Sequence, residues 1–173
     1  MTARYVFLDT EFVPIDDGSV LISIGIVSDD EREFYAERAS ADLVDAPWEL
    51  IGEPVRSQVR SQLGVRGVTL GTMSEIAWQL AAWLQGLNAD SLQVVYDYSA
   101  DFGFVEALQQ QVASPAWSKL VPIHVGYLLE DADGAKAADA EWARIGVERG
   151  LHRHHALADA WALRARFHAV HGE

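Results

Sequence analysis

Near the N-terminus the sequence reads Phe7-Leu8-Asp9-Thr10-Glu11-Phe12. The apolar residues up to Leu8 are rich in β-formers and predict a buried central strand over residues 5–8. Side chains alternate along a strand, so Asp9 and Glu11 share one face and Thr10 lies on the other. Two neighbouring carboxylates repel, and each prefers its neutral form when desolvated unless a cation lies between them. A solvated acidic strand end is the alternative, so the interpretation depends on whether other acids meet this pair.

The composition fits one globular domain over residues 1–173, since half of the residues are hydrophobic. There is no Cys, which excludes disulfides, Cys-ligated zinc and thiol catalysis. The net charge of −13 argues against a passive nucleic-acid-binding protein, which would present a basic face. An enzyme that meets phosphate through bound metal remains compatible with this charge.

The location of the protein is also suggested by its apolar segments. The first residues lack the apolar segment of a signal peptide, and the apolar run over residues 20–27 is too short to span a bilayer. We therefore expect a cytoplasmic protein with no membrane partner.

The first half of the chain predicts an antiparallel meander. An Asp-Gly turn over residues 14–18 separates the first strand from a second over residues 20–27, and a third is expected over residues 33–36. Residues 40–70 contain several Pro and Gly breaks and are interpreted as short helices and loops.

The second half alternates helices and strands. Thr72 and Glu75 form a capping-box pattern. The patterns predict helices over residues 72–87, 101–112, 135–147 and 156–170, and strands over residues 92–96 and 121–129. The expected architecture is α/β, with a mixed five-stranded sheet flanked by helices and its first three strands antiparallel.

Further acids follow later elements. Asp101 opens a predicted helix, where an ordinary N-cap is the simple interpretation, and Asp97 stands nearer to the end of the preceding strand. Asp159 lies in the first turn of an apolar helix and calls for a partner, which could be a metal or Arg153. The neighbouring histidines could instead suggest zinc, although the chain lacks Cys and an HExxH motif.

Taken together, these motifs resemble the DEDDh family of 3′–5′ exonucleases. The matching order is Asp-x-Glu on a first strand, Asp before a middle helix, and His-x-Ala-x-x-Asp at a last helix. The resemblance covers essentially the whole chain and implies a ribonuclease H-like fold. The segments that begin at Phe7, Leu21 and Glu33 are most similar to the RNase AS branch of adenylate-specific exoribonucleases.

The resemblance assigns metal binding to Asp9, Glu11, Asp101 and Asp159, and the catalytic histidine to His154. Helical geometry alone favours His155, which lies four residues before Asp159. The family pattern holds for His154 if it lies on the loop before the helix. The chain departs from the family at Asp97, where Asn is common, and in its run of histidines, so that Asp97, His152 or His155 could join the site.

The resemblance further implies the reaction and its partners. Two Mg²⁺ ions, with Mn²⁺ as a substitute, would support hydrolysis of single-stranded RNA from its 3′ end to nucleoside 5′-monophosphates. We expect Thr10, Phe12 and Arg153 to contact the substrate, with a preference for adenine, and the protein to form a homodimer. The alternatives are a DNA-directed 3′–5′ exonuclease on the same site, a ribonuclease H-type endonuclease and a non-catalytic interaction module.

Overall fold

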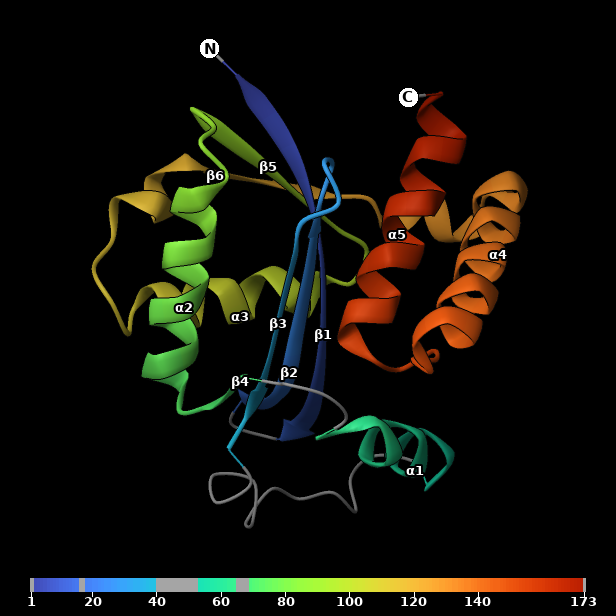
Figure 1. The fold of residues 1–173 in the computed structure, drawn as a ribbon, viewed down its shortest axis with the longest axis horizontal. Helices are drawn as coiled ribbons and strands as arrows, with labels where there is room; N and C mark the ends of the chain where they lie inside the picture. Colours follow the sequence, from blue (N-terminus) through green and yellow to red (C-terminus); the bar gives the residue numbers. More distant parts are fainter. Residues whose placement is uncertain (1, 16–17, 40–52, 65–68, 173) are drawn as a thin grey trace.

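Six strands form one mixed sheet in the computed structural model, which describes residues 2–15, 18–39, 53–64 and 69–172 (Figure 1). Their order across the sheet is β4-β3-β2-β1-β5-β6. The pairs β1–β2 and β2–β3 are antiparallel, and β3–β4, β1–β5 and β5–β6 are parallel. The strands are β1 (Ala3–Ile15), β2 (Gly18–Ser28), β3 (Glu33–Arg38), β4 (Thr69–Gly71), β5 (Ser91–Tyr96) and β6 (Leu120–His124).

The antiparallel meander of the first three strands is confirmed, but the prediction of five strands is wrong. The sixth strand, β4, has only three residues and carries no alternating apolar pattern that would have marked it. The predicted strand over residues 121–129 is also too long, because β6 ends at His124. The neighbouring strand β5 ends at Tyr96, which pairs with His124, so β6 has no partner beyond that residue in this ladder. A 3-10 helix (Gly126–Glu130) follows β6.

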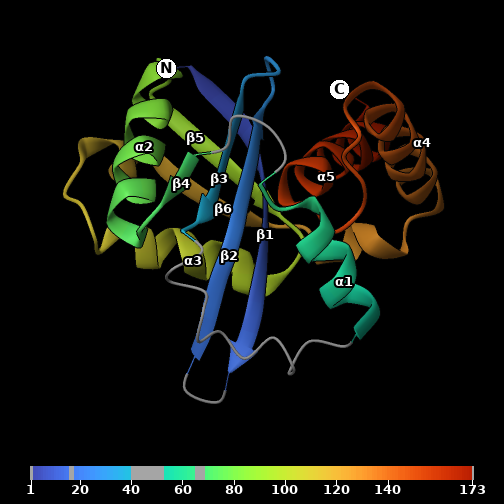
Figure 2. The same cartoon turned by 60° about the horizontal axis from the view of Figure 1, so that its bottom comes forward.

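Helices cover both faces of the sheet. They are α1 (Glu53–Gln62), α2 (Met73–Gly86), α3 (Ser99–Gln109), α4 (Ala132–Arg149) and α5 (Ala156–His171). Figures 1 and 2 show α2 and α3 on one face, and α4 and α5 on the other, with α1 beside the first turn of α5. Within the described ranges, none of the helices combines the length and the apolar character that a bilayer crossing requires.

Most helix predictions are confirmed within a few residues of their ends. The capping box of α2 is present, with Thr72 Oγ1 accepting from the Glu75 N–H and the Glu75 carboxylate accepting from the Thr72 N–H. The predicted turn over residues 14–18 joins paired Ile15 and Gly18, although its residues 16–17 lie outside the described residues. Of residues 40–70, the ranges 40–52 and 65–68 are likewise outside.

The alternation along β1 divides the core between the two faces. Val6 and Leu8 pack into the cluster under α2 and α3. Phe7 packs with Leu163 and Phe167 of α5 on the opposite face. Burial of these side chains on both faces fixes the register of β1, because a slip of one residue would turn every side chain to the other face. The same alternation decides where the polar residues that follow must point.

The first turn of α5 lies directly on the sheet at Gly25. A Cβ atom at this position would lie 2.3 Å from the carbonyl carbon of Ala156 and from the backbone nitrogen of Leu157. Gly25 pairs with Asp9 across the β1–β2 ladder. The missing side chain therefore lets the helix bring Asp159, near its start, close to the acids of β1.

We expect Gly25→Ala to destabilise the protein, because its methyl group would meet backbone atoms that can move only with the helix. The expected loss is about 3 kcal/mol or more of unfolding free energy, measured by urea denaturation. Gly103→Ala is the matched control, since a Cβ at Gly103 of α3 meets nothing within 4 Å. That change should stabilise α3 by up to about 1 kcal/mol. Equal stabilities of the two variants would contradict the close contact at Gly25.

Candidate active site

A cavity of about 450 Å³ gathers five carboxylates at the end of β5 and beside the middle of β1. Asp9 and Glu11 come from β1, and Asp97 follows β5. Asp101 enters from α3 and Asp159 from α5, on opposite faces of the sheet. The four acids named from the sequence motifs thus lie in one place, and Asp97 lies with them.

The predicted alternation of Asp9, Thr10 and Glu11 is confirmed by the positions of their side chains. Asp9 and Glu11 both line the cavity, and Asp9 Oδ2 is buried with no described protein group donating to it. Thr10 is buried, and its hydroxyl donates to Asp101 Oδ1 at 2.6 Å. That Thr10 contacts substrate stays a prediction, while in this structure its hydroxyl orients an acid.

Asp101 is not a helix cap. The residue that caps α3 is Tyr98, which makes no side-chain capping bond, and Asp101 is the third residue of the helix. Its side chain is almost fully buried, and its Oδ2 accepts no hydrogen bond from the described residues. The ordinary N-cap interpretation is therefore wrong, and one carboxylate oxygen is left available in the cavity.

Asp159 accepts hydrogen bonds from two donors that no local sequence pattern predicted. Trp142 Nε1 of α4 donates to Asp159 Oδ1 at 2.6 Å, and the backbone N–H of His154 donates to Oδ2 at 2.9 Å. Arg153, the partner considered from the sequence, lies instead over the ring of Trp142, with its guanidinium carbon 4.7 Å from the ring centroid. The only large aromatic residue of α4, Trp142, was the available sequence signal for this contact.

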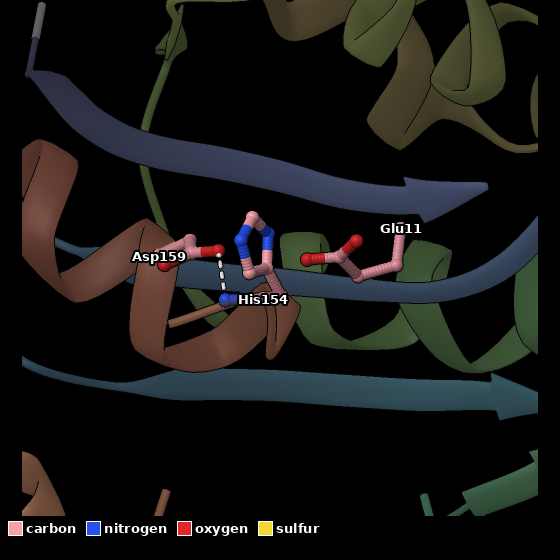
Figure 3. Close-up of side chains that lie close together, drawn as sticks. All are labelled: Glu11, His154 and Asp159. Atoms are coloured by element: carbon pink, nitrogen blue, oxygen red, sulfur yellow. Dashed lines mark hydrogen bonds between the residues drawn. The ribbon is translucent and has the colours of Figure 1, made fainter. Parts of the chain in front are cut away.

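His154 lies on the loop before α5, as its role in the family pattern requires. Its backbone has a φ of 65°, a left-handed conformation that is uncommon outside Gly. Figure 3 shows its imidazole between the carboxylates of Glu11 and Asp159, and these three residues have ligand atoms within 4.8 Å of one another. A second such group contains Asp9, Asp97 and Asp101.

The other two histidines of the run lie elsewhere. His155 is buried and stacks on Tyr35, with ring centroids 4.4 Å apart, and burial lowers the pKa of its imidazole to about 4. His152 is exposed and lines a different cavity. His154 is the histidine of this run that lines the carboxylate cavity.

Two of the predicted substrate contacts differ in their placement. Arg153 lines the cavity and is exposed. Phe12 is half-buried and does not line the cavity; its ring packs on Phe104, with centroids 5.2 Å apart, and on Tyr98 at 6.0 Å. Tyr98, against which Phe12 packs, does line the cavity and is 58% exposed, and a substrate contact of Phe12 stays a prediction.

Burial and mutual repulsion make the carboxylates reluctant to ionise. Burial, followed by the charges of Asp159 and Asp101, raises the pKa of Glu11 to about 8. Burial raises the pKa of Asp101 and of Asp159 to about 7, although the donors Thr10 and Trp142 oppose the shift. The pKa of Asp9 is raised well above its ordinary value by burial and by the neighbouring acids.

Arg166 is a cavity residue that the sequence interpretation did not single out. Its side chain is buried in the cavity wall, and its Nη1 donates to the carbonyl oxygen of Leu128 at 3.3 Å. Burial raises the pKa of Asp97, and the positive charge of Arg166 opposes that rise. The additional acid at this position is therefore partly balanced by a buried cation from the last helix.

The donor set fits hard divalent cations. Carboxylate oxygens are the ligands that Mg²⁺ and Mn²⁺ prefer. Asp9 Oδ2 and Asp101 Oδ2 are buried without donors in the described part of the chain and are available as ligand atoms. Cations would relieve the repulsion that raises the pKa values. The residues present therefore fit a metal-binding role at two adjacent groups of side chains.

No protein-family model and no curated protein matches this chain. The functional interpretation therefore rests on the geometry of the cavity and on the motifs quoted from the sequence.

The metal-free protein should lose stability as pH rises. The folded carboxylates keep their protons to a higher pH than the unfolded ones, so their stabilisation is complete below about pH 4 and is lost as pH rises through about 7 to 8. Asp9→Asn should raise the unfolding free energy in EDTA at about pH 8 by at least about 1 kcal/mol, with little effect at about pH 5.

Thermal and urea denaturation at both pH values would measure this. Asp139→Asn is the matched control, since Asp139 is exposed on α4. A stabilisation of the same size in the control, or none at the higher pH in Asp9→Asn, would remove the argument for repulsion in the cavity.

Trp142→Phe should weaken metal binding, because it deletes the N–H that orients Asp159. The phenyl ring would still lie beneath Arg153, so the aromatic contact of Arg153 is kept. The expected loss of Mn²⁺ affinity is about 10- to 100-fold, measured by titration calorimetry. Trp161→Phe is the control: Trp161 Nε1 donates to Glu33 Oε1 at the same distance of 2.6 Å, away from the cavity. Equal affinities in the two variants would show that Trp142 does not orient a ligand.

Proposed function

We propose that this chain is a metal-dependent 3′–5′ exoribonuclease that hydrolyses single-stranded RNA to nucleoside 5′-monophosphates. The observation that carries the proposal is the meeting of Asp9, Glu11, Asp101 and Asp159 with His154 in one cavity. These residues come from three elements and a loop, and ordinary structural roles do not account for them. Asp101 does not cap its helix, and buried carboxylate oxygens lack donors among the described residues.

A ribonuclease H-like fold is part of the proposal. The six-stranded mixed sheet, with its first three strands antiparallel and helices on both faces, is compatible with that fold. The acids also follow the order of the DEDDh motifs along the chain. Fold and motif order support the same family, although neither alone identifies an activity.

The four motif acids would hold the cations. Asp9, Asp101 and the neighbouring Asp97 form one group of ligand atoms. Glu11 and Asp159 supply the carboxylates of the other, and the His154 imidazole lies beside them. Two bound Mg²⁺ ions, or Mn²⁺ in their place, would supply an activated water and neutralise charge at the leaving 3′-oxygen. In this way an acidic protein can act on a polyanion without a basic face.

His154 acts as the general base. Burial and the charge of Arg153 lower the pKa of its imidazole, so the ring is neutral near neutral pH and has a nitrogen free to accept a proton. That nitrogen takes the proton of the attacking water as the oxygen bonds to phosphorus. The bond from phosphorus to the 3′-oxygen then breaks, and the terminal nucleotide leaves as a 5′-monophosphate.

Substrate contacts follow from the charge and shape of the cavity wall. Arg153 offers a positive charge to a phosphate, and its position over Trp142 limits its freedom. The exposed ring of Tyr98, supported from behind by Phe12, offers a face on which the terminal base can stack. A preference for adenine rests on the similarity to RNase AS, and the same similarity implies a homodimer, which light scattering after gel filtration would test.

The activity is tested with 5′-labelled single-stranded A, C, G and U homopolymers and an oligo(dA), each with Mg²⁺ or EDTA. We expect a ladder that shortens from the 3′ end, fastest on poly(A), and that disappears with EDTA. Asp9→Asn and His154→Ala should reduce the rate by at least about 100-fold, since each removes a group that acts on the reacting atoms.

The controls separate the site from its surroundings. Asp139→Asn and His152→Ala change the same residue types outside the cavity and should leave the rate unchanged. Faster shortening of oligo(dA) than of RNA would favour the DNA-directed enzyme, and internal cleavage products would favour an endonuclease. No cleavage with any divalent metal would overturn the proposal.

A further inference from the structure

The side chain of Gln62 contacts the loop that carries His154. Gln62 ends α1 and is buried, although it lies about 90 positions earlier in the chain. Its Oε1 accepts from the backbone N–H of His152 at 2.7 Å. Its Nε2 donates to the carbonyl oxygen of Arg153 at 2.9 Å and to that of Gln58 at 3.3 Å.

The partners themselves fix the orientation of this amide. A backbone N–H can only donate and a carbonyl oxygen can only accept, so the Gln62 oxygen must face His152 and its nitrogen must face Arg153. Both hydrogens of the amide nitrogen and its oxygen are then used. A buried side chain that makes three hydrogen bonds has little freedom to move.

One peptide unit of the loop is held at both ends. The carbonyl of Arg153 accepts from Gln62, and the N–H of the same planar unit, which belongs to His154, donates to Asp159 Oδ2 at 2.9 Å. The peptide plane that precedes the Cα of His154 is therefore fixed between α1 and a carboxylate of the candidate site. Because His154 also has its φ at 65°, the direction of its imidazole depends on that plane.

We propose that Gln62 is a positioning residue that sets the direction of the His154 side chain, an inference that rests on the proposed exoribonuclease function. It touches neither the reacting atoms nor the carboxylates, and it acts only through the backbone of the loop. Figure 2 shows α1 beside the start of α5, where this contact is made. In this way α1, the helix between β3 and β4, influences the candidate site through the loop that it contacts.

The test compares Gln62→Met with Gln58→Met, the same change one helical turn earlier, where the side chain is exposed. Gln62→Met should lower kcat by about 10- to 100-fold, because a displaced base loses its alignment, while KM stays within about twofold. Gln58→Met should match the wild type in both kcat and KM.

Two further measurements keep the test independent of activity and of folding. Hydrogen exchange of the His152 amide should accelerate at least about tenfold in Gln62→Met, and not in Gln58→Met. Gln62→Glu keeps the acceptor for His152 but puts an oxygen against the Arg153 carbonyl. The His152 amide should therefore exchange as slowly in Gln62→Glu as in the wild type, while kcat should still fall. This variant provides the test if Gln62→Met does not fold.

Unchanged kcat in a folded Gln62 variant would overturn the positioning role, even if amide exchange accelerated. If the wild-type protein cleaves no substrate, the proposed function fails and the exchange data stand alone. Faster exchange confined to Gln62→Met would then support the hold on the loop, and equal exchange in the two Met variants would overturn it.

Discussion

The contact of backbone on backbone at Gly25 is the constraint on which the rest of the structure depends. Only a residue without a side chain lets the first turn of α5 rest on the central strands, with 2.3 Å between a would-be Cβ and Ala156. That approach places Asp159 beside Asp9 and Glu11 on one side of the sheet. Asp101 completes the group from the other side, where Thr10 turns it inward.

The buried carboxylates that this contact brings together lower the stability of the metal-free protein. Carboxylates that are buried together raise one another's pKa. Among the described residues, Thr10 donates to Asp101, and Trp142 and the His154 backbone donate to Asp159, while Asp9 Oδ2 and Asp101 Oδ2 receive no donor. A fold selected for stability alone would replace such acids with apolar residues. The arrangement is accounted for most simply by a ligand of opposite charge, which is the reason for treating the cavity as a site.

Local patterns predicted the parts of the fold that follow local rules. Alternation along β1 separated Thr10 from its neighbouring acids, and the capping box located the start of α2. The three-residue strand β4 was missed because its pairing with β3 comes from tertiary structure and leaves no periodicity. Trp142 and Gln62 were missed for the same reason: each acts across a long stretch of sequence, where no spacing rule links donor to acceptor.

The raised pKa values also have a consequence for any cation that enters the cavity. Near neutral pH some of the carboxylates with a pKa of about 7 to 8 still carry protons, and a cation must displace these before it can bind. Binding therefore releases acid into the solution. The measured heat then includes the ionisation enthalpy of whichever buffer takes up those protons, so that the same titration in two buffers counts the protons lost.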